Sequence, residues 1–432
     1  MLRHEAHRTS MKRWKKLLLL LLVLIVLSQV PFAYRRYKLG RLHAAIQQVN
    51  SQRNVIPDDA GLVEYKGVAH VHSFLGGHSS GNFDQIIAAA QANDLDFVVM
   101  TEHPANHFST AAMTLKGEHG GVLFINGNEV RTANGDRLLL LPGDDEAAID
   151  ALRSTADVLS RRSSELEVVA YPEQFKSWDA KGYEGIEVYN VYTNARAINP
   201  VVMFFDALWS YRAYPDLLFA NFYRKPVASL KKWDEQIAQK GARLVATAGN
   251  DSHANLGLSL NDSTGKTLLG FKLDPYERSF RLVRLHVLSK DLSPLAGQLN
   301  AGQFNDSTVV TDISQGHCFI GFDLFGDTTG FRFTAQSAAE NKIMGDEIKL
   351  SGQVNFKISV PVQARIVLLK DGTAIQEASG TNRLEFVVRE QGSYRVEVYL
   401  PQLPGAVAGQ PWIISNPIYV RTEIPAVPYP LK

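Results

Sequence analysis

The sequence contains very little cysteine: Cys318 stands alone among 432 residues. A single cysteine excludes a disulfide bond within the chain and excludes any CxxC metal or redox site. A bound metal ion would therefore need histidine and carboxylate ligands. We expect the lone thiol to be a buried, inert side chain.

The chain also lacks a strong net charge, which is +1 overall. This balance hides an asymmetry, because residues 1–41 carry a net charge of +9 and the remainder carries −8. An acidic body offers no broad basic surface, so the charge argues against extended nucleic acid as a partner. With 45% hydrophobic and 21% charged residues, the composition is that of a globular protein. The length suggests two or three domains, each with its own core.

One long hydrophobic run is present near the start of the chain. Leu17–Leu27 is unbroken, and residues 17–34 form an apolar stretch of about eighteen residues, near the lower limit for a membrane-spanning helix. Six basic residues precede the run, which favours a cytoplasmic amino terminus. We therefore expect residues 1–41 to be a basic segment and signal anchor of a single-pass protein of the cell membrane, with the body periplasmic or extracellular.

A cleaved signal peptide, giving a secreted protein, is the main alternative, although no A-x-A site is evident. A buried hydrophobic helix is the third.

The pattern of apolar and polar residues divides the rest of the chain into a connector, 42–61, and two longer parts. Residues 62–325 alternate short apolar runs with helical patterns, which is typical of an α/β layer or barrel. Residues 326–432 carry short strands with alternating apolar residues and turn signals, which predict a small β-sandwich. The strands expected in the first part are Leu62–Ala69, Asp96–Thr101, Val122–Asn126, Arg137–Leu141, Glu167–Tyr171, Gly185–Tyr189, Arg243–Ala248 and Arg281–Leu288. Helices are expected at 82–93, 146–161 and 230–240, and C-terminal strands at 331–334, 354–360, 365–370, 384–388, 394–400 and 413–420.

Histidines and acids recur where the predicted strands end. His70 and His72 close the first strand, and residues i and i+2 of an extended strand share a face, so both can bind one metal ion. The same recurrence follows later strands, at Glu102-His103, Asn128-Glu129 and Asp251-Ser252-His253. Ligands at the carboxyl ends of successive strands are how an α/β barrel builds a site. Taken alone, the first pair could be two structural histidines; the whole set makes chance a poor explanation.

The ordered blocks GVAHVHSFLGGHSSGNFDQII, DFVVMTEH, NGNEV, GIEVYN and AGNDSH resemble the polymerase and histidinol phosphatase (PHP) superfamily of metal-dependent hydrolases. This resemblance covers residues 62 to about 260 and implies a distorted (β/α)7 barrel with up to three metal ions. The segment PWIISNPIYV and the strands before it resemble a carbaryl hydrolase-like branch of that superfamily.

The resemblance also implies ligands. One metal would be held by His70, His72, Glu129 and Asp251, and another by His78, His103 and His253. A third, intervening metal shares Glu129 in the family, but its two histidines are missing here. Tyr171 and Asp136 are the possible substitutes, so we expect one or two divalent ions, of Zn, Mn or Fe.

Two further features leave alternatives open. Arg131 could meet a substrate phosphate, or it could be an ordinary surface or paired arginine. The aromatic-rich segment 201–222 could be a lid or substrate wall, or a packed helical insertion.

These features together predict a metal-dependent hydrolase, most simply a phosphoesterase that acts on a small anionic substrate with metal-activated water. Asp251 and Glu129 are the expected catalytic carboxylates. A carboxyl-ester or carbamate hydrolase and a non-catalytic module that keeps metal for structure are the alternatives. An exonuclease is disfavoured by the acidic body.

Overall fold

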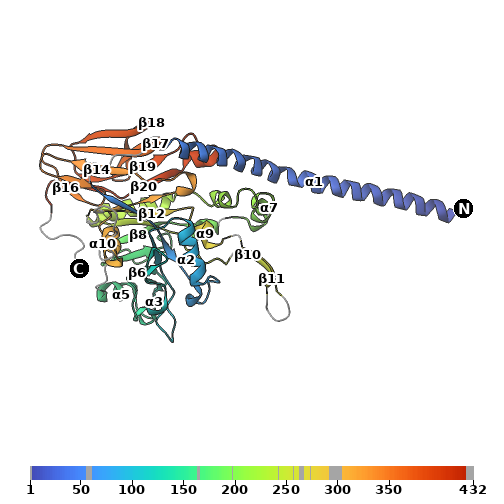
Figure 1. Ribbon diagram of the computed structural model, residues 1–432, viewed down its shortest axis with the longest axis horizontal. Helices are drawn as coiled ribbons and strands as arrows, with labels where there is room; N and C mark the ends of the chain where they lie inside the picture. Colours follow the sequence, from blue (N-terminus) through green and yellow to red (C-terminus); the bar gives the residue numbers. More distant parts are fainter. Residues whose placement is uncertain are drawn as a thin grey trace.

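A computed structural model describes residues 2–54, 61–162, 166–196, 198–241, 243–255, 257–261, 267–272, 274–290 and 304–424. The fold is mixed α/β, with one large branched sheet, a five-stranded sheet and a hairpin. Figure 1 shows the body on one side and a single long helix, α1, extending away from it.

Helix α1 (Leu2–Ser51) runs without interruption through Pro31. Residues 13–28 of this helix are exposed. The segment from Arg13 is long and apolar enough to span a membrane or to be a signal sequence. The C-terminal end of the same helix packs on the body, where Leu39, Leu42 and Ile46 are buried. The expected boundary at residue 41 therefore falls inside a continuous helix.

Beyond α1, the α-helices are short: α2 (Phe83–Ala92), α3 (Thr110–Met113), α4 (Ala147–Asp150), α5 (Thr155–Arg161), α6 (Val191–Ala195), α7 (Pro200–Ser210), α8 (Val227–Lys240), α9 (Tyr276–Ser279) and α10 (Asp306–Ser314). The 3-10 helices are η1 (Phe74–Gly76), η2 (Asp216–Asn221), η3 (Asp323–Phe325) and η4 (Gly405–Gly409). The helix expected at 82–93 is confirmed and begins at a capping box, in which the Asn82 side chain accepts from the backbone of Gln85. The helix expected at 146–161 is divided into α4 and α5.

The eight strands expected before residue 300 are all present. The strands up to that point are β1 (Val63–Val71), β2 (Phe97–Met100), β3 (Gly117–His119), β4 (Val122–Ile125), β5 (Asn128–Arg131), β6 (Arg137–Leu141), β7 (Leu166–Ala170), β8 (Gly185–Asn190), β9 (Val245–Gly249), β10 (Gly257–Asn261), β11 (Thr267–Lys272) and β12 (Arg284–Ser289). Strands β1, β2 and β4 are parallel, as are β7, β8 and β9. Strands β5–β7 pair in antiparallel fashion. A short turn connects β5 to β6, whereas a longer segment that contains α4 and α5 connects β6 to β7.

The C-terminal region is rich in strands, which form the layer at the top of Figure 1. They are β13 (Cys318–Gly321), β14 (Arg332–Gln336), β15 (Asn341–Ile343), β16 (Glu347–Lys349), β17 (Val354–Lys370), β18 (Thr373–Val388), β19 (Gly392–Tyr399), β20 (Pro411–Ser415) and β21 (Ile418–Arg421). Two expected strands are fused in β17, which turns into β18 through Asp371 and Gly372, both at positive φ, as a tight hairpin requires. The strand expected at 413–420 is broken at Pro417, which has no backbone donor.

The two parts share one sheet and one core. Strand β13 pairs with β12 on one side and with β20 on the other, so the ladder crosses the expected domain boundary at residue 326. The main cluster of buried apolar residues likewise runs from Leu39 to Val420. The expectation of a separate core for each part is therefore wrong: the C-terminal strands continue the sheet that carries β1.

Candidate metal centre

Strand β1 brings His70 and His72 into the interior, although not by the simple alternation that the sequence suggested. The register of β1 against β2 shifts between Val68 and Val71, and His70 has a φ of 63°. A bulge of this kind turns a side chain out of its regular direction. Both imidazoles are nevertheless completely buried and lie side by side, with ring centroids 5.1 Å apart.

Four side chains converge here, from β1, from β5 and from the residues just after β9. One ligand atom from each of His70, His72, Glu129 and Asp251 lies within 4.8 Å of the other three. Glu129 Oε2 is 3.1 Å from His70 Nε2 and 3.4 Å from His72 Nε2. Asp251 Oδ1 is 3.6 Å and 3.5 Å from the same two nitrogens. The structure thus brings together all four residues expected to hold the first metal, in a group that can bind a metal ion.

A second group lies beside the first and shares His72 with it. Its ligand atoms come from His72, His103 and His253. The expected set had His78 in place of His72. His78 is exposed, and its Nε2 lies 2.9 Å from His253 Nε2, at the edge of the group. Because Glu129 Oε2 is also 3.4 Å from His103 Nε2, this oxygen lies between the two groups.

In three of the histidines, one ring nitrogen already has a hydrogen-bond partner, which leaves the other nitrogen for a ligand role. Nδ1 lies within hydrogen-bonding distance of a backbone carbonyl in His78 (Gly76, 3.2 Å), His103 (Glu129, 3.2 Å) and His253 (Asp251, 2.8 Å). A hydrogen bond at one ring nitrogen fixes the tautomer that offers the other to a metal. The Nε2 atoms of all three therefore suit metal coordination.

Unpartnered buried atoms fit the same conclusion. Within the described part of the chain, His72 Nε2 and Asp251 Oδ1 are buried and have no hydrogen-bond partner. A buried polar atom without a partner is costly, so such atoms call for an explanation such as an ion. Three carboxylates, of Glu129, Glu187 and Asp251, are also buried within this small volume. Buried charge of one sign requires compensation, which a divalent cation would supply.

Sequence reasoning missed Glu187, which orients His70. Glu187 Oε1 lies 2.7 Å from His70 Nδ1, and its Oε2 accepts a hydrogen bond from Asn190 Nδ2 at 3.0 Å. A Cβ at Gly249 would lie only 1.8 Å from Glu187 Oε1, so only glycine allows β9 to pass this pair. The sequence does contain one signal for this role. Glu187 is the acidic residue within the apolar segment GIEVYN, and a carboxylate buried in such a segment needs a partner.

The two suggested substitute ligands have other roles. The Tyr171 hydroxyl donates a hydrogen bond to Asp251 Oδ2, so it contacts the first group from outside. Asp136 is buried away from both groups: its oxygens accept hydrogen bonds from the backbone of Lys176 at 2.7 Å and from the hydroxyls of Thr155 and Ser177 at 2.7 and 2.5 Å. Asp136 therefore holds the segment after β7 in place, and among the described residues it belongs to neither group of candidate ligands.

The arginine at the site is Arg137, not Arg131. Arg131 is exposed and, among the described residues, is not one of those that line the cavity over the cluster. Arg137 lies on β6, the strand that pairs with β5. Its guanidinium lies 2.6 Å from Glu129 Oε1 and 5.1 Å from the centre of the Tyr171 ring. No sequence pattern predicts this pair, because it arises from the register of β5 against β6.

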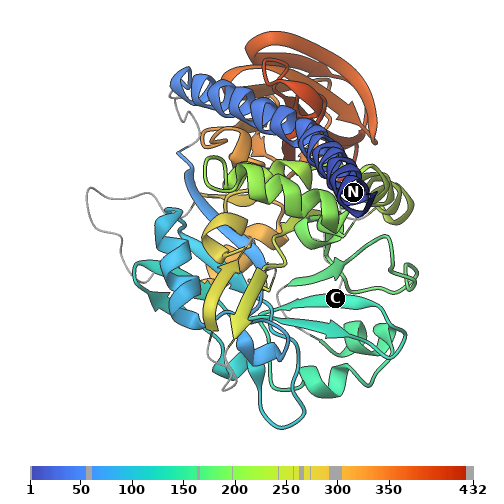
Figure 2. The same ribbon diagram turned by 90° about the vertical axis from the view of Figure 1, so that its right-hand side faces the viewer.

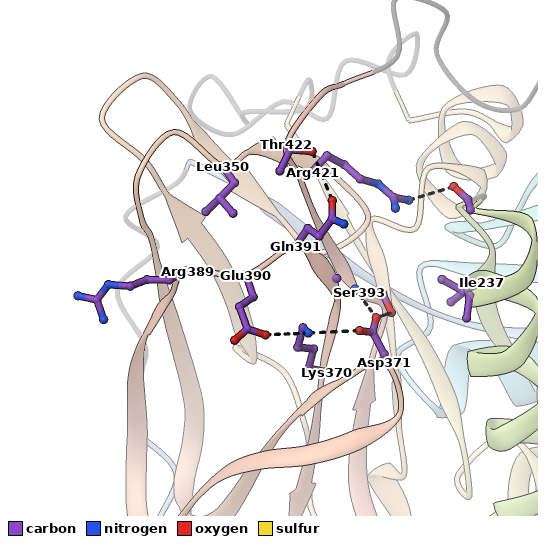
Figure 3. A pocket seen from close by; sticks show the side chains of 13 residues that line it. Ile237, Leu350, Lys370, Asp371, Arg389, Glu390, Gln391, Ser393, Arg421 and Thr422 are labelled. Carbon is purple, nitrogen blue, oxygen red and sulfur yellow. Dashed lines mark hydrogen bonds and ion pairs between the residues drawn. The ribbon is translucent and has the colours of Figure 1, made fainter.

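A cavity of about 250 Å³ opens directly over the cluster. It is lined by His78, His103, Glu129, Arg137, Tyr171, Gln174, Tyr192, Arg196, Asp251, His253, Asn255 and Asp274. A larger hollow of about 750 Å³ lies elsewhere, between α8 and the C-terminal strands, and is shown in Figure 3. Its Lys370 is paired with Glu390 at 3.0 Å and with Asp371 at 3.7 Å, so these three charges are engaged with one another. Of these two cavities, the smaller one is lined by candidate metal ligands and opens to solvent. It is therefore the candidate binding cavity.

Burial and mutual charge shift the protonation equilibria in the cluster. Burial lowers the pKa of His103 to about 3 and that of His253 to about 4, so both are neutral near pH 7, as metal ligands must be. For Asp251 and Glu129, burial would raise the pKa, but the adjacent histidines outweigh it and lower both pKa values. Both carboxylates are therefore ionised at neutral pH.

Comparisons with known proteins add little to this geometry. No protein-family model and no curated protein sequence matches the chain. One solved structure, the crystal structure of PsfC from Pseudomonas syringae PB-5123, aligns with a TM-score of 0.33 and 14% sequence identity over 60% of this chain and 91% of that one. A likeness of that size carries no functional argument, so function has to be argued from the site itself.

Proposed function

We propose that the protein is a metal-dependent hydrolase similar to the PHP superfamily, and most simply a phosphoesterase. One observation carries the proposal: four buried ligand atoms, from His70, His72, Glu129 and Asp251, meet within 4.8 Å of one another below an open cavity. Mixed imidazole and carboxylate ligands suit Zn, Mn or Fe.

The strand arrangement supports a distorted (β/α)7 barrel around the cluster. The end of β2 meets the start of β5 through a parallel bridge between Glu102 and Asn128, and β1 meets the segment after β9 through a second bridge between Val71 and Ser252. These bridges link the five-stranded sheet to both edges of the β1–β2 pair. His70, His72, His103 and Asp251 then lie at the carboxyl ends of β1, β2 and β9, which is where barrel enzymes carry their sites.

Each of the two groups would hold one metal ion. His70, His72, Glu129 and Asp251 would hold one ion, and His103 and His253, with His72 or His78, would hold a second. A divalent ion bound in an open site lowers the pKa of a bound water and polarises a phosphoryl or acyl oxygen.

The chain's own residues prepare the carboxylates for these roles. Arg137 engages Glu129 Oε1, which leaves Oε2 directed at His70, His72 and His103. The Tyr171 hydroxyl, with its pKa raised by burial and by Asp251, stays protonated and engages Asp251 Oδ2. Asp251 Oδ1 therefore remains free to hold an ion or to accept a proton from attacking water.

The lining of the cavity favours a small anionic substrate. Arg137 and Arg196 both line it, and guanidinium groups bind phosphoryl oxygens in a bidentate manner. A volume of about 250 Å³ admits a small molecule or one end of a larger one. A phosphate monoester or diester fits this charge better than a neutral carboxyl ester or carbamate does.

Full-length protein, purified in detergent and loaded separately with Mn, Zn or Fe, tests the activity. We expect it to hydrolyse p-nitrophenyl phosphate or bis-p-nitrophenyl phosphate, and Glu129→Gln to abolish turnover while the exposed Glu118→Gln leaves it unchanged. Turnover of p-nitrophenyl acetate alone would replace the phosphoesterase proposal with the carboxyl-ester alternative. Metal binding with no turnover of any ester would favour the non-catalytic alternative.

We further propose that α1 is retained as a membrane anchor and that the body lies outside the cytoplasm. Support comes from the basic residues before the apolar run and from the packing of the end of α1 on the body. A carboxyl-terminal alkaline phosphatase fusion, active only after export, tests the topology. Activity of a cytoplasm-only reporter at the same position would refute it.

A further inference from the structure

Helix α7 presents an apolar face that no described part of the chain covers. Val201, Phe204 and Leu208 have exposed fractions of 62%, 48% and 68%. Their spacing of three and four residues places them on one face of the helix. The opposite face is buried, at Asp206 and Ser210. This pattern, one bare apolar face on a packed helix, marks an interaction surface.

Direct contacts fix α7 against α1. The ring of Phe205 lies 5.0 Å from that of Phe32, and Trp209 Nε1 donates a hydrogen bond to Gln29 Oε1 at 3.0 Å. Arg35 on α1 also forms two hydrogen bonds with the carboxylate of Asp206, at 2.6 and 2.5 Å. Figures 1 and 2 both show α7 beside α1 where α1 leaves the body.

The contacted part of α1 lies at one end of its apolar run. Trp14 and Tyr34, which are 67% and 57% exposed, bracket the run. They are 20 residues apart, which is about 30 Å along an α-helix and equals the hydrocarbon thickness of a bilayer. Trp and Tyr gather at the two membrane–water interfaces. The residues of α1 that α7 contacts, 29–36, therefore lie at the level of the second interface.

We propose that α7 lies in the interface of the bilayer that α1 spans, with Val201, Phe204 and Leu208 in contact with lipid. The argument for lipid as the occupant is continuity, because the exposed apolar face adjoins the exposed apolar run of α1 at the depth where an interfacial helix lies. This inference rests on α1 being membrane-inserted and is independent of the hydrolase proposal.

The contact has a geometric consequence for the cavity. Helix α6 and the residue after it carry Tyr192 and Arg196, which line the cavity, and α7 follows at Pro200. A lipid contact through α7 therefore holds one wall of the cavity at a fixed distance from the bilayer.

Fluorescence quenching in phosphatidylcholine nanodiscs tests the proposal on the full-length chain. A single cysteine is introduced as Phe204→Cys or Leu208→Cys and labelled with NBD, since Cys318 is completely buried. Leu20→Cys, within the apolar run, is the inserted control, and Leu152→Cys, 80% exposed on the body, is the solvent control. Doxyl-labelled lipid should quench the labels at 204, 208 and 20, with blue-shifted emission, and leave the label at 152 unquenched.

The other results contradict the proposal. Labels at 204 and 208 that stay unquenched while the label at 20 is quenched would show that lipid does not cover α7. A blue shift without quenching, in particles that contain two copies of the chain, would assign the face to self-association. An unquenched label at 20 would show that α1 is not inserted, which removes the basis of the inference.

Discussion

Replacing Glu187 by glutamine is the sharpest test of how this fold orients its candidate ligands. The Glu187 carboxylate lies 2.7 Å from His70 Nδ1 on one side and accepts from Asn190 on the other. Glutamine preserves the volume but removes the charge. Its amide can present an oxygen to only one of these two donors, so the other faces an NH₂ group. The His70 ring then loses either its fixed tautomer or its fixed orientation.

The position of Glu187 beside His70 determines how much metal affinity the substitution should remove. Removing an outer partner of a ligating histidine typically lowers metal affinity about 10- to 100-fold. Because Glu187 and His70 are both fully buried, water cannot replace the lost interaction, and we expect the upper part of that range, which corresponds to about 2–3 kcal/mol of binding free energy. Turnover at saturating metal should change less than metal affinity does, since Glu187 does not line the cavity.

Titration of the full-length protein with Mn²⁺ against a fluorescent chelator measures this affinity directly. Circular dichroism confirms that the variant is folded, and Glu118→Gln, on the exposed strand β3, serves as the matched control. Wild-type Mn²⁺ affinity in a folded Glu187→Gln protein would refute the argument that this carboxylate orients a metal ligand.

Three further predictions follow from the same geometry. Asp251→Asn should lower kcat by roughly a hundredfold or more, the scale of general-base loss, with an unchanged circular dichroism spectrum, whereas the exposed Asp145→Asn should not; full activity in the Asp251 variant would show that the site is assigned wrongly. Asp136→Asn should lower the free energy of unfolding by about 1–3 kcal/mol in urea titrations, because three donors lose a charged acceptor, and an unchanged urea midpoint would contradict this. Burial alone would lower the pKa of His286, but Asp323 and Glu64 raise it to about 9, so its contribution to stability is complete below about pH 6.5 and is lost as the pH rises through 9. The melting temperature should fall over that interval, and His286→Gln should flatten the fall.

The sequence indicated which side chains would converge because their signal is local. His70, His72, His103 and Asp251 lie at or within a few residues of the end of an apolar strand, and the ends of parallel strands meet at one edge of a sheet. The resemblance to the PHP superfamily placed His70, His72, Glu129 and Asp251 in one group, and the structure brings these four side chains together. Strand positions before residue 300 were predicted for the same reason, since continuous apolar runs are clear in sequence.

What the sequence could not predict depends on register and on packing. Arg137 reaches Glu129 only because β5 and β6 pair antiparallel with Glu129 opposite Leu139. The burial of Asp136 depends on the path of the segment after β7, which holds its backbone and hydroxyl donors in place. The continuous sheet through β13 was also hidden, because pairing between strands distant in the chain leaves no local pattern.

Elemental analysis of the purified full-length protein tests the central claim most directly. Inductively coupled plasma mass spectrometry should find one or two divalent ions per chain, and a folded His70→Ala/His72→Ala variant should lose the ion held by the first group. Three firmly bound ions would contradict the argument that Tyr171 and Asp136 leave the intervening position without ligands. A folded wild-type protein that binds no metal after incubation with Zn, Mn and Fe would contradict the account as a whole.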